Sequence, residues 1–264
     1  MNNKIIKIAV VGAYGRMGKS IIQEVKKYKN ILCVCGVVKK KNHDILFNDN
    51  KKIKITENII QEINNFDVLI DFSTPKNTLN NLYICQKYNK KIIIGTTGFT
   101  EDEICNIKKY SKNFAIVFSE NFSIGINLIF QLLKKTIKVL NNYDIEILEK
   151  HHRNKIDAPS GTALKIGEII SKYNKWDINQ CSIYRKKEIT HIRKRNKIGF
   201  SIIRGGDIIG EHQIMFLGHG ENIIFKHQAT NRHTFSHGAI QAAIWIMKKQ
   251  NGFFNMIDVL NILK

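Results

Sequence analysis

The feature that most constrains the fold is a glycine-rich stretch near the start of the chain, VVGAYGRMGKS. Residues 5–11 form the near-continuous apolar run of a buried strand, and residues 16–28 have the periodicity of a helix. At such a junction Gly12 permits a tight turn, Gly15 a close approach of the backbone to a ligand, and Gly18 close packing of helix on sheet. The stretch therefore predicts a dinucleotide-binding turn, with a helix N-terminus behind it for a pyrophosphate.

The spacing of these glycines departs from the usual pattern. It is G-x-x-G-x-x-G instead of G-x-G-x-x-G, and Tyr14 stands where the second glycine usually lies. A glycine turn that binds no ligand is therefore the alternative interpretation. The position of the stretch at the first strand-to-helix turn favours dinucleotide binding.

Alternating strand and helix signals continue through the first half of the chain. Near-continuous apolar strands separated by helices indicate a parallel sheet that is covered on both faces. Further strands are expected at residues 31–38, 68–72, 91–94 and 115–118, and helices at residues 75–88 and 101–111.

After Asn121 the pattern changes. Residues 182–229 show only strand-like stretches broken by glycines, which is typical of an antiparallel or mixed sheet. A strand is also expected at residues 144–149, and helices at residues 124–140, 165–173, 234–249 and 253–263.

We therefore predict an α/β fold with two domains. The first is a Rossmann-type parallel-sheet nucleotide domain, formed by residues 1–122 together with residues 233–264. The second is an inserted α+β domain, residues 123–232, which we expect to bind substrate.

Composition limits the partners and the compartment. The formal charge of +20 raises the alternative of a nucleic-acid-binding protein, but the lysines are scattered as doublets and form no basic stripe interleaved with aromatics. We expect no nucleic-acid partner and a general attraction for small anions. No apolar run approaches the ~20 residues that span a bilayer, so no membrane association is expected. The apolar stretch at the N-terminus is interpreted as a strand and not as a signal peptide.

The five cysteines are an odd number and lack paired metal-ligand spacing. Free thiols in a reducing cytoplasm are the expected state. Cys33 and Cys35 are two residues apart in a predicted strand, so we expect them to share one face of it.

The end of the second predicted strand bears on cofactor choice. NAD-binding domains often carry an acid there, but this chain has Lys39, Lys40 and Lys41. A solvated loop is the alternative interpretation. Lysines at this place, together with Arg16, suit the 2′-phosphate of NADP, so we predict a preference for NADPH over NADH.

Two later strand ends belong to the same site if the sheet is parallel, because ligands lie outside the carboxyl ends of its strands. Their small and hydroxyl side chains suit a nicotinamide ring. At a third strand end, before Pro75, Ser73 and Thr74 are as readily explained by helix capping. The two strand ends are Gly95, Thr96 and Thr97, and Ser119, Glu120, Asn121 and Phe122.

A basic segment, EKHHRNKIDAPSGTAL, follows the predicted strand at residues 144–149. His151 and His152 are adjacent instead of four residues apart, and no cysteine or paired acid accompanies them, so no metal site is expected. Lys155 and the helix N-terminus behind Ser160 suit the carboxylate of an anionic substrate. A neighbouring histidine can donate a proton near neutral pH.

The chain resembles the 4-hydroxy-tetrahydrodipicolinate reductase (dihydrodipicolinate reductase) family from end to end. The family's signature E-x-H-H-x-x-K-x-D-x-P-S-G-T-A is matched by the basic segment. Other matching motifs are VGAYGRMG, DFSTP, IGTTGF, NFSIGIN, RGGDIIGEH and TFSHGAIQAAIW. The resemblance implies NAD(P)H-dependent reduction of 4-hydroxy-tetrahydrodipicolinate to tetrahydrodipicolinate in lysine and diaminopimelate biosynthesis, by a homotetramer joined through the second domain.

The resemblance also implies roles for individual residues. His151 matches the proton donor and Lys155 the second catalytic residue, so hydride would add to ring carbon 4 and His151 would protonate the adjacent carbon. His152, Gly161 and Thr162 match substrate-binding positions, and we include Ser160 with them. Matching cofactor contacts are Gly12, Ala13, Tyr14, Gly15, Arg16, Met17, Gly95, Thr96, Thr97, Ser119, Glu120, Asn121 and Phe122.

Two positions depart from the family's pattern. Lys39 and Lys40 replace its common acidic–basic pair, which bears on cofactor preference, and Asn154 stands where some members have a further histidine. Two alternative functions are consistent with the sequence. The first is that of another two-domain NAD(P)-dependent reductase, although no cysteine lies in a motif suited to thioester chemistry. The second is that of a non-catalytic, basic nucleic-acid-binding protein.

Overall fold

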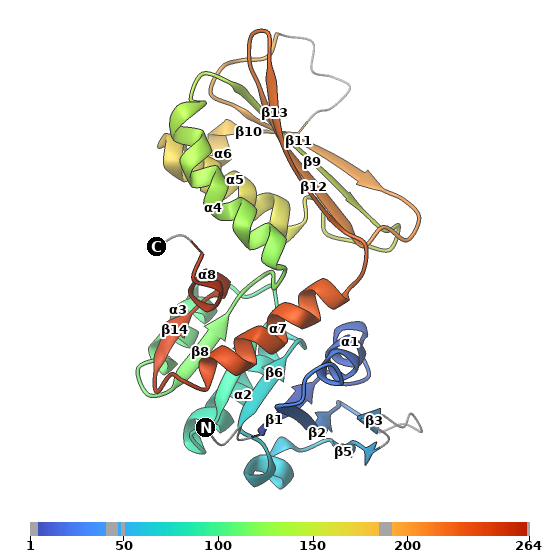
Figure 1. The fold of residues 1–264 in the computed structure, drawn as a ribbon. Coiled ribbons are helices and arrows are strands. Elements are labelled where there is room, and N and C mark those ends of the chain that lie inside the picture. Colours follow the sequence, from blue (N-terminus) through green and yellow to red (C-terminus); the bar gives the residue numbers. More distant parts are fainter. Residues whose placement is uncertain (1–4, 41–46, 49–50, 185–191, 263–264) are drawn as a thin grey trace. The chain divides into compact units, whose positions relative to one another are not determined.

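The computed structural model describes residues 5–40, 47–48, 51–184 and 192–262. These residues form two compact units (Figure 1). The first unit contains the chain up to Ile124 and Arg232–Ile262, and the second contains Gly125–Asn231. None of the described helices is long and apolar enough to cross a membrane.

The first unit is built on a seven-stranded sheet in the order β14-β8-β7-β6-β1-β2-β5. Every pair of neighbours in it is parallel, as the unbroken apolar runs predict. Its strands are β1 (Ile6–Val11), β2 (Ile31–Val37), β5 (Lys54–Thr56), β6 (Val68–Asp71), β7 (Lys91–Ile94), β8 (Ala115–Phe118) and β14 (Gly252–Phe254). A separate short hairpin is formed by β3 (Phe47–Asn48) and β4 (Lys51–Lys52).

Helices cover both faces of this sheet. One core contains Ile21 of α1 and Ile240 of α7, and the opposite core contains Leu82 of α2 and Ile107 of α3. The predicted Rossmann-type fold is therefore confirmed. The helices are α1 (Arg16–Val25), α2 (Pro75–Lys87), α3 (Glu101–Tyr110), α7 (His233–Ile246), α8 (Met256–Leu260) and the 3-10 helix η1 (Ile59–Asn65).

A bulge in β2 overturns one prediction. Ile8 pairs with Cys33 but the next residue, Ala9, pairs with Cys35, so Val34 is an extra residue in the ladder. Cys33 therefore lies in the core beside α1 and α7, whereas Cys35 lies in the opposite core. The prediction that the two cysteines share a face was wrong, because a bulge shifts the alternation by one residue.

The C-terminal region also differs from its prediction. Residues 253–263 were expected to form one short helix, but β14 precedes α8 and pairs in parallel with β8. The ring of Phe253 stacks on Phe118, with centroids 5.9 Å apart, and Phe254 meets Trp245 edge-on at 4.9 Å. Pairing with the sheet edge and aromatic packing outweigh the local helical pattern.

The second unit contains a five-stranded sheet in the order β10-β11-β9-β12-β13. β9 runs parallel to β11, and β12 runs antiparallel to both β9 and β13, so the predicted mixed sheet is confirmed. Its elements are β9 (Asp144–His151), β10 (Ser182–Tyr184), β11 (Ile198–Arg204), β12 (Gly210–Leu217), β13 (Asn222–Ala229), α4 (Ile124–Val139), α5 (Gly161–Asn174) and α6 (Ile178–Cys181).

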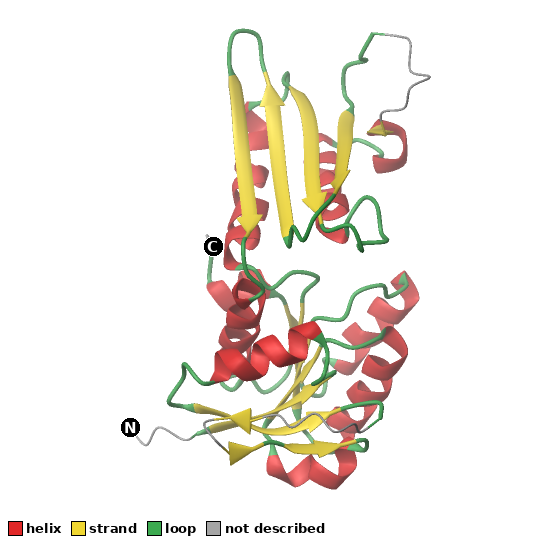
Figure 2. Cartoon of the chain, turned by 90° about the vertical axis from the view of Figure 1, so that its right-hand side faces the viewer, coloured by secondary structure: helices red, strands yellow, loops and turns green. Residues whose placement is uncertain are grey.

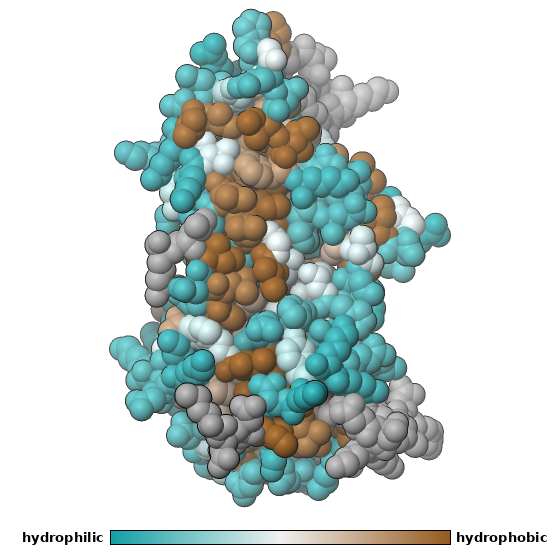
Figure 3. Space-filling model, viewed as in Figure 1, coloured by the Kyte–Doolittle hydropathy of each residue, from teal (hydrophilic) through white to brown (hydrophobic). Residues whose placement is uncertain are grey.

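The two faces of this second sheet differ. One packs on α4 and α5 through a core that includes Phe130, Ile166 and Phe216. The other is turned to the viewer in Figure 2, with the helices behind it. Outside the core, apolar side chains also follow the exposed side of α4, among them Leu128 and Val139 (Figure 3). The second unit thus leaves apolar surface uncovered by its own chain.

Candidate functional site

The glycine turn of the first unit is built from backbone contacts. Gly12 has a φ of +71°, which side chains rarely adopt, and its N–H donates to the Val37 carbonyl at 2.9 Å. The Gly15 N–H donates to the Gly12 carbonyl at 2.8 Å. A Cβ on Gly18 would lie 2.2 Å from that same carbonyl oxygen. The turn can therefore form only if these positions lack side chains.

The N-terminus of α1 follows directly. Gly15 is its N-cap and offers no capping side chain, and Arg16 at the first helical position is exposed. First-turn N–H groups have no acceptor within the helix and carry partial positive charge. Burial lowers the pKa of the Arg232 guanidinium, and the nearby positive charge of Arg16 lowers it further. The turn is thus electropositive and suits a phosphate.

A cleft of about 760 Å³ opens at the carboxyl ends of β1, β2 and β6. β1 has β2 on one side and β6 on the other, so the cleft lies where the strand order reverses, the usual position of a dinucleotide. Its volume is within the range of cofactor sites, about 300–1,000 Å³. The lining residues are Val11, Gly12, Val37, Val38, Lys39, Glu57, Asn58, Ile59, Ser73, Thr74, Lys76, Asn77, Asn80, Asn81 and Ile84.

A buried carboxylate shapes one wall of this cleft. Asp71 accepts hydrogen bonds from the backbone and hydroxyl of Ser73, and from Asn81 at 2.9 Å. Burial raises the pKa of Asp71 despite these donors. The Thr96 hydroxyl accepts from the Ser73 N–H and from the Thr78 hydroxyl. Asp71 and Thr96 therefore hold Ser73 at the cleft wall.

This network separates the predicted residues at the end of β7. Thr96 is buried in the network, Thr97 is exposed, and Gly95 packs on the ring of Phe72. A Cβ on Gly95 would lie 2.2 Å from that ring. Gly95 and Thr96 thus stabilise the strand end by packing and hydrogen bonding. Of the three residues, Thr97 is the one whose side chain is exposed to solvent.

The predicted residues after β8 form a tight turn. The Ser119 hydroxyl donates to the Asn121 carbonyl at 2.8 Å, and the Asn121 side chain accepts from the Ser123 N–H. Glu120 is exposed, whereas Phe122 is buried against Phe72 with ring centroids 5.4 Å apart. The Phe122 ring is therefore a core group.

The lysines after β2 are not equivalent. Lys39 and Lys40 are both exposed, but only Lys39 is among the residues that line the cleft. Lys41 lies outside the described residues. The cleft wall also contains Lys76 and the carboxylate of Glu57, which the sequence reasoning did not single out.

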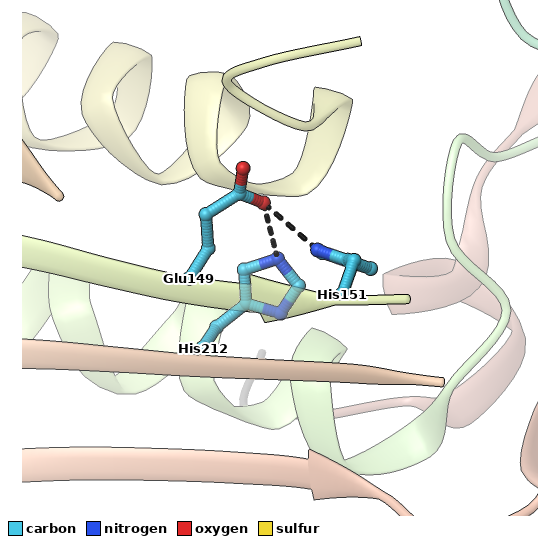
Figure 4. A group of neighbouring side chains, drawn as sticks. All are labelled: Glu149, His151 and His212. Atoms are coloured by element: carbon cyan, nitrogen blue, oxygen red, sulfur yellow. Dashed lines mark ion pairs between the residues drawn. The ribbon is translucent and has the colours of Figure 1, made fainter. Parts of the chain in front are cut away.

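In the second unit, three buried side chains converge from two strands (Figure 4). Glu149 and His151 are two residues apart on β9, so they point to the same face, toward α5. His212 of β12 pairs with Glu149 in the antiparallel register and joins them. The Glu149 Oε2 atom lies 3.1 Å from His151 Nδ1 and 3.8 Å from His212 Nε2.

The other carboxylate oxygen of Glu149 has two donors. The Ser160 N–H donates to Oε1 at 3.1 Å and the Arg204 guanidinium at 2.7 Å. Burial alone raises the pKa of Glu149, but His151, Ser160 and Arg204 together outweigh it and hold the pKa at about 2. Glu149 is therefore ionised at neutral pH.

His212 has the opposite electrostatic character. Burial, followed by the neighbouring His151, lowers the pKa of His212 to about 3, so its imidazole is neutral. Its Nε2 lies 3.1 Å from the Ser160 hydroxyl, which also accepts from the Ala163 N–H as the N-cap of α5. Ser160 thus connects the helix N-terminus to the buried cluster.

The residues predicted to bind a substrate carboxylate lie around this cluster. α5 begins at Gly161, and a Cβ there would meet nothing within 4 Å, so the helix N-terminus is open. Thr162 is half-buried in the first turn, and His152 is half-buried directly after β9. Lys155 Nζ contacts both oxygens of Asp157, at 2.7 and 2.8 Å. The lysine is thus held by a carboxylate in this structure.

The cluster also has the composition of a metal site. Glu149, His151 and His212 each place one donor atom within 4.8 Å of the others, a grouping that the sequence reasoning missed because it weighed only adjacent histidines. Arg204 already supplies a cation to this carboxylate. The arrangement is suited to proton transfer. A histidine whose Nδ1 faces a carboxylate keeps one proton on Nδ1, so the proton that a protonated ring can release is the one on Nε2.

Three residues of the cluster had no assigned role in the sequence reasoning. Glu149 was quoted only as part of the basic segment, and Arg204 and His212 only as part of RGGDIIGEH. Nothing local shows that β11 and β12 flank β9 in the register that brings them together.

Comparisons with known proteins agree along the whole chain. The N-terminal family model of dihydrodipicolinate reductase matches residues 6–122, and the C-terminal model matches residues 125–260. A 4-hydroxy-tetrahydrodipicolinate reductase of Buchnera aphidicola subsp. Acyrthosiphon pisum (strain APS) is 50% identical over 269 residues, covering 98% of this chain and 100% of that protein. The protein of that name from Buchnera aphidicola subsp. Baizongia pistaciae (strain Bp) is 47% identical, covering 99% and 100%.

Solved structures show the same fold. A dipicolinate-bound dihydrodipicolinate reductase from Paenisporosarcina sp. TG-14 aligns with a TM-score of 0.76 at 24% identity, over 98% of this chain and 100% of that one. An amine dehydrogenase from Mycobacterium smegmatis aligns with a TM-score of 0.64 at 8% identity, over 95% of both chains. At these identities the likeness concerns the fold alone.

Proposed function

The chain belongs to the dihydrodipicolinate reductase family, and on this premise we propose which of its residues perform the reaction and with which cofactor. It is an oxidoreductase that reduces 4-hydroxy-tetrahydrodipicolinate in lysine and diaminopimelate biosynthesis. The residue assignment depends on a buried histidine, His151, whose Nδ1 lies 3.1 Å from the Glu149 carboxylate, which itself accepts from the N-cap residue of α5.

The first unit binds the cofactor in this proposal. The turn from Gly12 to Met17 binds the phosphates, and the carboxyl ends of β7 and β8 receive the nicotinamide. The fit is supported by the tight turn that the glycines form, in which a Cβ on Gly18 would strike the Gly12 carbonyl, and by the α1 N-terminus directly behind it. When bound, the nicotinamide cofactor would supply a hydride to ring carbon 4, once the 4-hydroxyl group has left as water and the ring is the conjugated dihydrodipicolinate.

NADPH is the preferred cofactor in this proposal. Lys39 and Lys76 line the cleft at the end of β2 and at α2, and cations there suit the 2′-phosphate. Glu57 is the one carboxylate among the described residues that line the cleft, so the two lysines outnumber it.

The substrate dicarboxylate binds to the second unit. One carboxylate accepts from Lys155 and replaces Asp157 as the lysine's partner. The α5 N-terminus at Ser160, Gly161 and Thr162 binds a carboxylate as well, with His152 beside it. Two cationic environments for two carboxylates select a dianion over a neutral imine.

Proton delivery falls to His151. Lys155 and the α5 N-terminus withdraw electrons from the ring and stabilise the charge that develops there on reduction. His151 then delivers the proton from Nε2 to the carbon next to ring carbon 4. Its Nδ1 stays directed at Glu149 throughout.

We further propose a cytoplasmic homotetramer joined through the second unit. The uncovered sheet face carries exposed Ile203 and Ile224. Between them lies an ion-pair chain from Lys150 to Glu211 to Lys226. A partner's matching face would bury these apolar groups. The five cysteines are free, which supports a reducing compartment.

A turnover assay tests the function. The substrate is formed in situ by the synthase that condenses pyruvate with aspartate semialdehyde, and oxidation of NADPH and NADH is followed in parallel. We expect oxidation that depends on both precursors and is faster with NADPH. Equal rates would contradict the cofactor preference alone, and no oxidation by folded protein would contradict the function.

A further inference from the structure

We infer that Glu149, held by Arg204, is a positioning residue that fixes the tautomer and the ring orientation of His151, and that Gly210 keeps space at the other ring nitrogen. The inference rests on the proposed role of His151 as proton donor. It gives roles in proton delivery to Glu149, Arg204 and Gly210.

The carboxylate of Glu149 is held in one orientation. Ser160 and Arg204 both donate to Oε1 of Glu149, which leaves Oε2 facing His151 Nδ1 at 3.1 Å. Glu149 is only 1% exposed, so water does not compete for this oxygen. A buried carboxylate beside a ring nitrogen favours the tautomer with a proton on that nitrogen. His151 is thereby set to release its proton from Nε2.

Ionisable groups lie around His151. Glu149 faces it from β9 and His212 from β12, and Arg204 of β11 reaches it through Glu149. Lys155, from the loop after β9, is close enough to His212 to lower the pKa of His212. The rings of His151 and His212 meet edge to face with centroids 5.2 Å apart. Because His212 stays neutral, it fills this space without repelling the protonated donor.

Gly210 lies at the opposite edge of the His151 ring. A Cβ on Gly210 would lie 3.1 Å from Nε2 and 3.4 Å from Cδ2 of His151. Any larger residue at the start of β12 would therefore crowd the nitrogen that delivers the proton. Glu149 and Gly210 thus act on opposite edges of one ring: the first aligns it and the second leaves its reactive edge open.

Arg204 adds a link to the substrate-binding loop. Its guanidinium donates to Glu149 and to the Asp157 carbonyl, both at 2.7 Å. The loop that carries Lys155 is therefore tied to the carboxylate that aligns His151. Arg204 therefore contacts both the partner of the proposed proton donor and the loop of the proposed carboxylate-binding lysine.

The test replaces Glu149 by glutamine, which keeps the shape and removes the charge. We expect kcat at neutral pH to fall about 10- to 100-fold, and the pH above which kcat declines to move to lower values. The Kd of dipicolinate, an unreactive dicarboxylate probe, should stay within about threefold. Glu168→Gln, on the exposed surface of α5, is the matched control and should leave all three unchanged.

Two further measurements separate positioning from a merely structural role. Ring nitrogen NMR of His151 in alkaline solution should show the proton on Nδ1 in the native protein and a mixed tautomer in Glu149→Gln. Glu149→Asp, which keeps the charge, should recover most of the native pH profile; it also serves if the glutamine variant does not fold. Gly210→Ala should lower kcat while dipicolinate still binds.

The outcomes distinguish the inference from the proposed function. If His151→Ala keeps its kcat, His151 is not the proton donor and the proposed function of that residue fails. If His151→Ala loses kcat while Glu149→Gln keeps the native rate, pH profile and tautomer, the inference alone is overturned.

Discussion

The glycine turn of the first unit and the Glu149 cluster of the second are built in opposite ways. The turn lies within seven consecutive residues and depends on side chains that are missing: Gly18 would strike the Gly12 carbonyl if it carried a Cβ. The cluster depends on side chains that are present, and they come from β9, β11, β12 and the start of α5. One site is readable from local spacing, and the other exists only after the sheet has formed.

The difference extends to what stabilises each site. Backbone hydrogen bonds and close packing maintain the turn, so it contains no buried charge that needs a partner. Glu149 is a buried carboxylate, and removing one partner of such a group leaves an uncompensated charge. The turn should therefore fail through steric crowding, and the cluster through loss of a charge or a proton. Four experiments test this contrast.

The largest effect is expected from removal of the proton donor. His151→Ala should lower kcat by about 10²–10⁴-fold, since proton transfer in the transition state contributes that much. Thr162→Ala, in the first turn of α5, should mainly raise KM, because in the proposed binding mode Thr162 contacts the substrate carboxylate equally in the ground state and the transition state. Steady-state kinetics with in-situ substrate measures both. Equal changes in KM with kcat intact in both variants would refute the assignment.

A methyl group at Gly18 should be next in size. Its Cβ would lie 2.2 Å from a backbone oxygen that cannot move aside, and overpacking of this kind costs about 1–3 kcal/mol. The Kd for NADPH, measured by fluorescence titration, should rise about 5- to 150-fold. Gly205→Ala is the control, because a Cβ there meets nothing within 4 Å. Native affinity in Gly18→Ala would mean that the turn does not bind the cofactor.

Charge reversal at the cleft should have a smaller effect that separates two neighbouring lysines. Lys39→Glu should shift the ratio of kcat/KM for NADPH and NADH toward NADH by about 5- to 30-fold, since a contact charge pair in water is worth about 1 kcal/mol and the substitution replaces an attraction by a repulsion. Lys40→Glu should shift it less, because Lys40 is not among the residues that line the cleft. Equal shifts would show that long-range charge and not contact decides the preference.

The smallest effect concerns acid stability. The pKa of His212 is about 3 in the folded chain against 6.5 for the free group, so the unfolded chain binds the extra proton between these values. Stability should therefore fall as pH drops below 6.5. Glu149 adds to this below pH 4.5, because its lowered pKa of about 2 stabilises the fold only while it is ionised.

His212→Gln isolates the histidine contribution. Its Tm should change less between pH 7 and pH 5 than that of the native protein, by several degrees in thermal unfolding followed by circular dichroism. The exposed His219 of the same unit provides the control variant His219→Gln. An unchanged pH dependence in His212→Gln would show that its burial has no thermodynamic consequence.

Several features of the chain could be read from its sequence because their causes are local. Ser160 caps α5, and Pro75 begins α2, as their residue types predict. The parallel sheet follows from unbroken apolar runs between helices, since strands buried on both faces need no alternation. The basic segment placed His151 and Lys155 at the end of a strand, where the structure has them.

Other features were decided by tertiary structure, because they depend on which strands become neighbours. The bulge that sends Cys33 and Cys35 to opposite faces arises from the register of β2 against β1. Residues 252–254 form β14 because the edge of β8 offers hydrogen bonds to them. His212 and Arg204 reach Glu149 only through the β12 and β11 registers. Local spacing thus determined which chain segments carry the candidate site residues. Long-range strand pairing determined which of these residues lie in contact, because a hydrogen-bonded register brings together residues that are far apart in the sequence.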